Sequence, residues 1–197
     1  NSFYKLPEKK TLKTWFDTVP DNFLFTFKAN RYITHMKKLK DPEKPVANLY
    51  DRTEILQNKL GPVLFQLPPR WKFNEDRLRS FLKTLSDNYQ YTFEFRDESW
   101  WNDTTYQLLK EHNVAFCIFE LAGRQSPREV TTDFIYIRLH GPGDAYQGEY
   151  DNQTLSGWAG AFHAWKDAGK QVYCYFDNDQ NGYAANDAMK LKNMITP

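Results

Sequence analysis

The chain has 197 residues, of which 41% are hydrophobic and 17% aromatic, so it is long enough to bury one sizeable core, and we expect a single domain over residues 1–197. Its 26 basic and 25 acidic residues leave a net charge of +1, which excludes a global field that would hold the protein on nucleic acid or on an anionic membrane. No apolar run approaches the roughly 18 residues of a membrane span, so no membrane partner is expected.

The two cysteines, Cys117 and Cys174, each fall inside an apolar, strand-like run. This placement predicts buried thiols rather than a disulfide or a metal pair. Buried free thiols fit a reducing compartment, so we expect a cytoplasmic location. No charged-then-apolar leader precedes the first element, and Asn1 to Tyr4 looks like the end of a strand.

Strand-like and helix-like segments then alternate along the whole chain. The predicted strands, in chain order, are residues 23–28, 63–67, 91–96, 115–119, 134–140 and 171–176. The predicted helices are residues 12–19, 46–60, 76–85, 102–109, 155–168 and 183–195. Gly61 and Pro62 are expected to end the second, and Asn102 or Asp103 is expected to cap the fourth. No helix can be placed between Glu120 and Asp133. This alternation predicts an α/β fold with parallel strands.

Several strands carry apolar side chains on one face and ionic ones on the other, because successive side chains of a strand point to opposite sides. Glu94 and Arg96 alternate with phenylalanines, and Arg138 and His140 alternate with aliphatic residues. Since helices must cover the apolar face, the ionic residues are expected to share an interior.

The natural closure of this pattern is a TIM (β/α) barrel, whose chemistry lies at the carboxyl ends of its strands. A complete barrel typically has about 250 residues, so we expect a single barrel domain that is N-terminally incomplete and lacks its first strand-helix unit.

Six motifs in order carry a resemblance to a known family. They are Asn-Ser-Phe-Tyr4, Phe25-Thr-Phe-Lys-Ala-Asn with Ile33-Thr-His35, Lys59-Leu-Gly-Pro-Val-Leu-Phe-Gln-Leu-Pro-Pro69, Phe93-Glu-Phe-Arg with Ser99-Trp100, Tyr136-Ile-Arg-Leu-His-Gly141, and Tyr175-Phe-Asp-Asn-Asp179. Together they resemble the YecE-like family, a domain of unknown function with a TIM-barrel fold. The resemblance implies the fold and the location of the site, but no activity. Asp97 and Asp177 depart from the family pattern, so no role carries over to them.

Cations and polar groups gather late in the strands and in the loops that follow. The residues expected to bind substrate are Lys28, Arg31, Gln66, Arg96, Arg138, Tyr175, Asn178 and Asp179. Lysine and arginine side chains aimed at one mouth would bind phosphate or carboxylate. The alternative is an internal ion-pair network in which Glu94 and Asp177 neutralise the cations, since buried charges must be paired.

His140 and Glu94 are the candidates for proton transfer. Glu94 lies beside Arg96 and is expected to stay ionised, whereas His140 titrates near neutrality, so His140 is the better acid or base. The alternative is a hydrogen-bonded structural histidine. After His140 comes the loop Gly141 to Tyr150, whose glycines allow close backbone approach to a phosphate or simply form a flexible turn.

Other classes of chemistry lack their motifs. No Ser-His-Asp nucleophile motif, Walker loop or dinucleotide fingerprint is present, and no cofactor is expected. Cations among the candidate ligands argue against a metal. The sequence therefore predicts an anion site that hydrolyses a phosphate ester or acts on nucleic acid. Two alternatives remain: a non-catalytic protein that binds an anionic small molecule or single-stranded nucleic acid, and a scaffold whose mouth is an ion-pair core.

Overall fold

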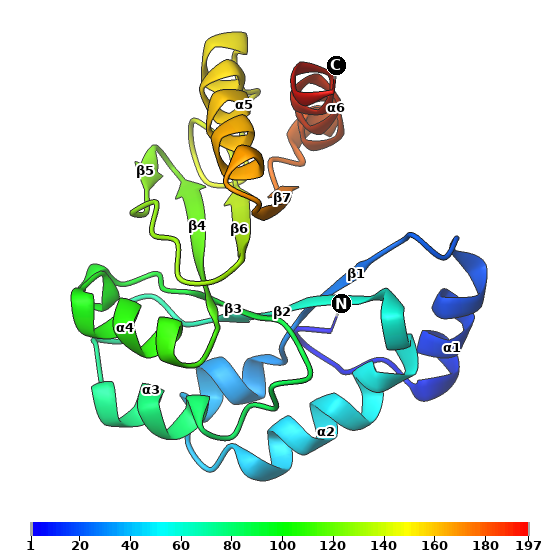
Figure 1. The fold of residues 1–197 in the computed structure, drawn as a ribbon, viewed down its shortest axis with the longest axis vertical. Coiled ribbons are helices and arrows are strands. Elements are labelled where there is room, and N and C mark those ends of the chain that lie inside the picture. The colour runs from blue at the N-terminus through cyan, green and yellow to red at the C-terminus, as the bar shows by residue number, and fades with distance from the viewer. Residues whose placement is uncertain (1, 197) are drawn as a thin grey trace. The chain divides into compact units, whose positions relative to one another are not determined.

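The computed structural model describes residues 2–196 and divides into two compact units, Asn1–Val114 and Ala115–Pro197, each of which contains parallel strands (Figure 1). In the first unit the strands are β1 (Phe25–Lys28), β2 (Leu60–Gln66) and β3 (Tyr91–Glu94). Its helices are α1 (Lys9–Thr18), α2 (Glu43–Thr53), α3 (Glu75–Leu82) and α4 (Asp103–Glu111). A π-helix at Tyr32–Met36 and 3₁₀ turns at Glu54–Lys59 and Glu98–Trp100 complete the unit.

The sheet of the first unit has the order β1-β2-β3 with all strands parallel. Phe65 stacks on Phe93 with ring centroids 5.2 Å apart, and Phe81 of α3 packs edge-on against both. Because Gln66 pairs in register with Glu94, these two residues share the opposite face of the sheet. The predicted separation of apolar and polar faces is therefore confirmed in this unit.

Local signals set the helix boundaries. Asn102 caps α4 by accepting a 2.9 Å hydrogen bond from the Thr105 amide, as its position before the helix predicted. The second predicted helix is shorter than expected, because α2 ends at Thr53 and Gln57 has a positive φ of 45°. Gly61 and Pro62 lie inside β2 instead of ending a helix.

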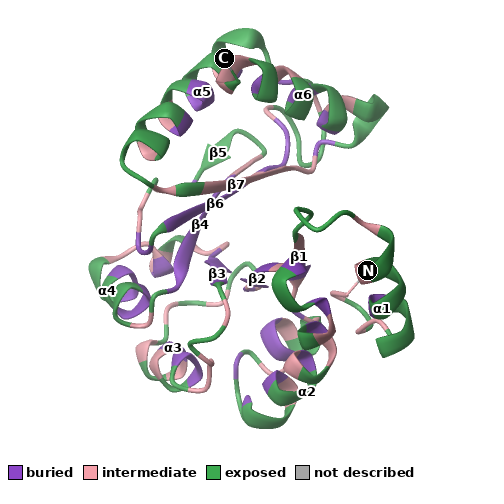
Figure 2. Cartoon of the chain, turned by 45° about the vertical axis from the view of Figure 1, so that its right-hand side comes forward, coloured by how far each residue is buried: buried purple, intermediate pink, exposed green. Residues whose placement is uncertain are grey.

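The second unit contains β4 (Ala115–Leu121), β5 (Arg124–Gln125), β6 (Phe134–Leu139) and β7 (Gln171–Phe176). Its helices are α5 (Asn152–Asp167) and α6 (Tyr183–Ile195), with a 3₁₀ turn at Gln180–Gly182. Strands β4, β6 and β7 are parallel, and the short β5 pairs antiparallel with β4 in the stretch where no helix could be placed. Strands β4 and β6 are largely buried and β7 is mostly of intermediate exposure (Figure 2).

The α/β class and the parallel pairing within each unit confirm the predicted alternation. Barrel closure and a single domain stay predictions. At the N-terminus, Ser2 to Tyr4 form a turn rather than the end of a strand, while Asn1 lies outside the described residues. None of the helices described in residues 2–196 is long and apolar enough to cross a membrane.

Candidate functional site

The carboxyl ends of β6 and β7 bring three ionisable side chains together. The Arg138 guanidinium donates a hydrogen bond to Oδ2 of Asp177, and Nδ1 of His140 lies 3.1 Å from the same oxygen. The His140 contact is close enough for an ion pair, although its angle falls short of a hydrogen bond. One carboxylate oxygen thus serves both partners. It keeps them in place at the strand ends.

Strand register explains why these residues meet. Arg138 of β6 is paired with Tyr175 of β7, so the two side chains lie on the same face of the sheet. Tyr175 also packs against Tyr136, with ring centroids 5.2 Å apart. Asp177 follows Tyr175 by two residues and shares its face. The other face carries Cys174 and Phe176 toward α5 and α6.

The three side chains of this cluster differ in how far they are exposed to solvent. The His140 side chain is completely buried, Arg138 is 12% exposed and Asp177 is 30% exposed. Solvent therefore reaches the carboxylate from one side while the imidazole is enclosed. A buried imidazole beside an accessible ion pair is an arrangement in which a bound anion can meet both a cation and a proton donor.

The loop Gly141 to Tyr150 closes over His140. Tyr146 packs edge-on against the His140 ring at 5.3 Å, yet half of Tyr146 is exposed to solvent. Gly141 has φ of 110°, and a Cβ there would lie 2.2 Å from the Gln147 carbonyl oxygen. Only glycine fits this position, because a side chain would meet backbone atoms. The Tyr150 hydroxyl accepts a 3.0 Å hydrogen bond from the Gly141 amide.

Asn178 and the buried Asp187 anchor this loop to α6. The Asn178 amide donates to the Gly148 carbonyl and to Asp187, each at 2.8 Å. Asp187 also accepts from the Tyr150 amide at 3.0 Å. The Asn178 Oδ1 atom is buried without a hydrogen-bond partner among residues 2–196. Asn178 is thus a positioning residue in the structure, and Asp179 beside it is exposed.

In the first unit, the end of β3 carries a second ion pair. Arg96 Nε donates to Glu94 Oε1 two residues away along the same chain segment. The Glu94 side chain is fully buried and that of Arg96 is 7% exposed. This pairing matches the ion-pair alternative for Glu94. The substrate role of Arg96 and the catalytic role of Glu94 stay predictions.

The end of β1 is covered by the N-terminal turn. The Lys28 ammonium lies 4.3 Å from the centre of the Phe3 ring, and the exposed Arg31 guanidinium lies 5.7 Å from that of Tyr4. His35 packs edge-on against Phe3. Burial, followed by the nearby charges of Lys28 and Arg31, lowers the pKa of His35, which favours the neutral ring.

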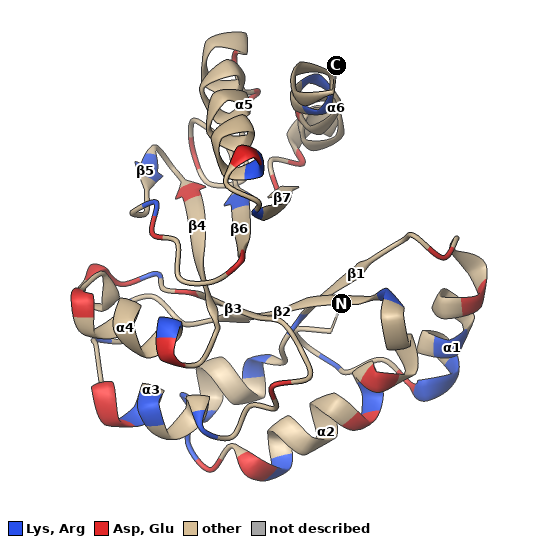
Figure 3. Ribbon diagram, viewed as in Figure 1, with Lys and Arg blue, Asp and Glu red and all other residues tan. Residues whose placement is uncertain are grey.

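An acidic and a basic position mark the ends of β4 and β6 (Figure 3). Glu120, in β4, is paired in register with Leu139 and so shares the helix-facing side of its sheet. Burial raises the pKa of Glu120, while Arg128 acts in the opposite direction. No three His, Cys, Asp or Glu side chains within residues 2–196 are placed to hold a metal ion.

Comparisons with known proteins identify the family. The model of the family described as "Protein of unknown function DUF72" matches residues 1–197, so this chain belongs to that family. It is 22% identical to the UPF0759 protein YunF of Bacillus subtilis (strain 168), covering 98% of this chain and 80% of that protein.

Two crystal structures of the family have the same fold. One is the DUF72 family protein TM1631 from Thermotoga maritima MSB8, with a TM-score of 0.86 and 26% identity over 98% of this chain and 81% of that one. The other is EF0366 from Enterococcus faecalis V583, with a TM-score of 0.84 and 19% identity over 98% of this chain and 82% of that one.

Asp177 is expected from the sequence as a partner that neutralises the cations, and it makes that contact with Arg138. Two further residues of the site lie outside the predicted set. Tyr146 lies in a loop, and its contact with His140 depends on a positive φ of 67° that has no sequence signal. Asp187 lies on α6, and nothing in its neighbourhood along the chain indicates that it is buried.

Proposed function

We propose that the carboxyl ends of β6 and β7 bind a phosphate ester and hydrolyse it, the ester being a small molecule or a nucleic acid. One observation carries the proposal: buried His140 and cationic Arg138 share one partly exposed carboxylate, that of Asp177. A phosphate group can take the place of that carboxylate on Arg138. The guanidinium binds carboxylates and phosphates alike, through two parallel N–H groups.

Each side chain then has a role. Arg138 binds the phosphoryl oxygens and stabilises the charge that grows on them as water attacks phosphorus. His140 transfers the proton, taking it from the attacking water or giving it to the leaving oxygen as the ester P–O bond breaks. Asp177 orients the imidazole through Nδ1. Tyr146, half exposed over His140, contacts the leaving group.

The alternative is a non-catalytic protein that holds an anionic small molecule or a single strand at the same place. The observation that favours it is the near-complete pairing of the charges, since Asp177 already neutralises Arg138. The two functions separate on turnover. A hydrolase releases product from a phosphomonoester or phosphodiester panel, whereas a binding protein only retains the ligand with a salt-dependent affinity.

The experiment compares the wild type with His140→Gln and Arg138→Met on such a panel. We expect hydrolysis to fall about 100-fold or more in His140→Gln, within the usual range for general acid–base residues. His112→Gln, on the carboxyl-terminal side of α4, and Arg70→Met, an exposed arginine, are matched controls that keep wild-type rates. If no ester of the panel is hydrolysed while phosphate still binds, the hydrolase proposal is wrong and the binding-protein alternative holds.

The finer expectations from the sequence belong to this proposal too. They are a (β/α) barrel, a cytoplasmic location, and a contribution of Lys28, Arg31, Gln66, Glu94 and Arg96 to ligand binding; strand parity supports the first and last, and the free thiols of Cys117 and Cys174 support the second. Phosphate calorimetry on folded Arg96→Met tests the contribution of that residue, and a loss of affinity would support it.

A further inference from the structure

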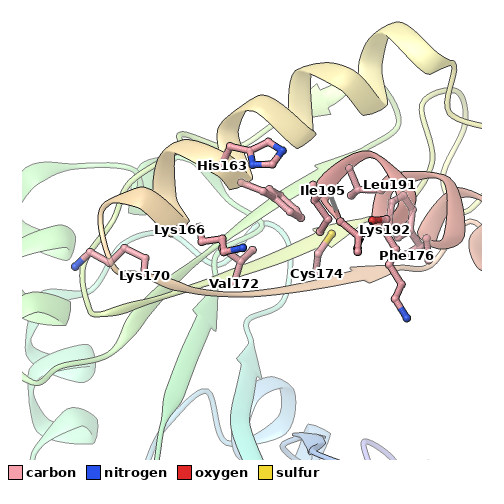
Figure 4. Close-up of a pocket in the computed structure, with 12 residues that line it drawn as sticks. His163, Lys166, Lys170, Val172, Cys174, Phe176, Leu191, Lys192 and Ile195 are labelled. Carbon is pink, nitrogen blue, oxygen red and sulfur yellow. Dashed lines mark hydrogen bonds between the residues drawn. The ribbon is translucent and has the colours of Figure 1, made fainter.

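A separate cavity lies in the second unit between β7, α5 and α6, with a volume of about 410 Å³ (Figure 4). Its apolar lining includes Phe162, Val172, Cys174, Phe176, Leu191 and Ile195. The strand residues among them point to the helix-covered face of β7, opposite Tyr175 and Asp177. The cavity is therefore distinct from the anion site proposed above.

The apolar floor of the cavity is incompletely covered. Val172, Cys174 and Phe176 of β7 are only half-buried, whereas the residues paired with them on β6, Ile135 and Ile137 among them, are fully buried. Burial still raises the pKa of the Cys174 thiol, which keeps it protonated and apolar in character. The cavity thus offers aliphatic surface that an apolar ligand can cover.

The rim of the cavity is basic. His163, Lys166, Lys170 and Lys192 are among the lining residues, and no described lining residue is acidic. Figure 4 shows the Lys166 ammonium next to Val172, whereas the side chains of Lys170 and Lys192 extend away from the floor. Lys170 is held by the Thr132 carbonyl at 3.2 Å and by Asp133 at 3.1 Å. Within residues 2–196, Lys166 and Lys192 make no ion pair, so their positive charge is not neutralised by the protein.

We infer that this cavity binds an amphipathic carboxylate with a single aliphatic tail, such as a medium-chain fatty acid. The tail lies over Val172, Cys174 and Phe176, and the carboxylate meets the ammonium group of Lys166. An apolar pocket with a charged group at its edge and a volume of this size is typical of small-molecule sites, which run from about 300 to 1,000 Å³.

Octanoate is the probe, and calorimetry on the full chain is the measurement. We expect saturable binding of octanoate, binding at least tenfold weaker for octanol, which lacks the charge, and none for acetate, which lacks the tail. The variant Lys166→Ala should weaken octanoate binding at least tenfold and leave octanol unchanged. Lys110→Ala, at an exposed lysine of the first unit, is the matched control with wild-type affinity.

Two further measurements locate the ligand. Cys174→Phe fills the cavity and should abolish octanoate binding. If that variant does not fold, a photoreactive octanoate analogue decides, because crosslinks to β7, α5 or α6 would locate the ligand in this cavity. The inference is overturned if octanoate does not bind, if octanol binds equally well, if Lys166→Ala binds octanoate with wild-type affinity, or if the analogue crosslinks elsewhere. None of these outcomes depends on the phosphate-ester proposal.

Discussion

The carboxyl end of β3 and the carboxyl ends of β6 and β7 carry similar residues in different settings. Glu94 and Arg96 form a pair within one chain segment, with both side chains almost sealed from solvent. Arg138 and Asp177 come from neighbouring strands, include His140 as a third member, and leave Asp177 30% exposed. The same alternation thus produces a closed pair in one unit and an accessible cluster in the other.

This difference indicates where function is supported. Removal of a buried ion pair affects mainly stability. An accessible carboxylate shared by two partners can be displaced by another anion. We therefore expect changes at the β3 pair to affect mainly stability and changes at the β6 and β7 cluster to affect mainly ligand binding, and the following variants test each half.

The largest effect is expected from Glu94→Gln. This change removes a buried negative charge that accepts a hydrogen bond from the Arg96 guanidinium, which should lower the free energy of unfolding by about 3–5 kcal/mol. Urea denaturation measures it. Glu111→Gln, at an exposed carboxylate 3.8 Å from Arg79, is the matched control and should cost less than about 1 kcal/mol. A loss below about 1 kcal/mol in Glu94→Gln would contradict the structural role.

Gly141→Ala should be next. The new Cβ meets the Gln147 carbonyl and the positive φ disfavours alanine, so we expect a loss of about 2–3 kcal/mol and weaker phosphate binding as the loop moves. Gly143→Ala in the same loop is the control, since nothing lies within 4 Å of its added Cβ. Equal melting temperatures for the two variants would contradict the requirement for glycine at position 141.

Asp177→Asn separates stability from binding. Because solvent reaches Asp177, its loss should cost about 1–2 kcal/mol, less than that of Glu94. Phosphate affinity should rise, since the competing negative charge on Arg138 is removed. Denaturation and phosphate calorimetry on one preparation measure both quantities. If the variant loses stability and binds phosphate no better than the wild type, this cluster contributes to stability and not to anion binding.

The smallest effect concerns pH and Glu120. Burial raises its folded pKa above the unfolded value, so the folded state binds the proton more tightly. The stability from this group is present below the unfolded pKa of about 4.3 and is lost as pH rises through the folded pKa. Glu120→Gln should therefore stabilise the protein more at pH 8 than at pH 4, by less than about 1 kcal/mol because the residue is partly exposed. An equal effect at both pH values would contradict the shift.

Most of what the sequence could predict follows from strand parity, the alternation of side chains between the two faces of a strand. A period of two places Glu94 on the same face as Gln66, and Arg138 on the same face as Tyr175, without any knowledge of long-range contacts. Helix caps also depend on nearby residues, since Asn102 accepts its hydrogen bond from an amide only three residues further along the chain. These features depend on residues within a few positions of one another, which is why pattern alone reveals them.

The remaining features depend on contacts between distant segments. The turn at Ser2 to Tyr4 lies over Lys28 through a ring contact that no spacing indicates. Tyr146 reaches His140 because of one backbone angle, and Asp187 is buried because α6 packs onto the loop after β6. Gly61 and Pro62 were misread because both residues commonly end helices, while here they lie in a strand.

Titration calorimetry with inorganic phosphate, on the wild type and on folded Arg138→Met at two salt concentrations, tests the central claim most directly. We predict one saturable site in the wild type that weakens as salt increases, and at least a tenfold loss of affinity in Arg138→Met. A wild type that binds no phosphate, or an Arg138→Met variant that binds it with undiminished affinity, would contradict the assignment of the β6 and β7 cluster as an anion site.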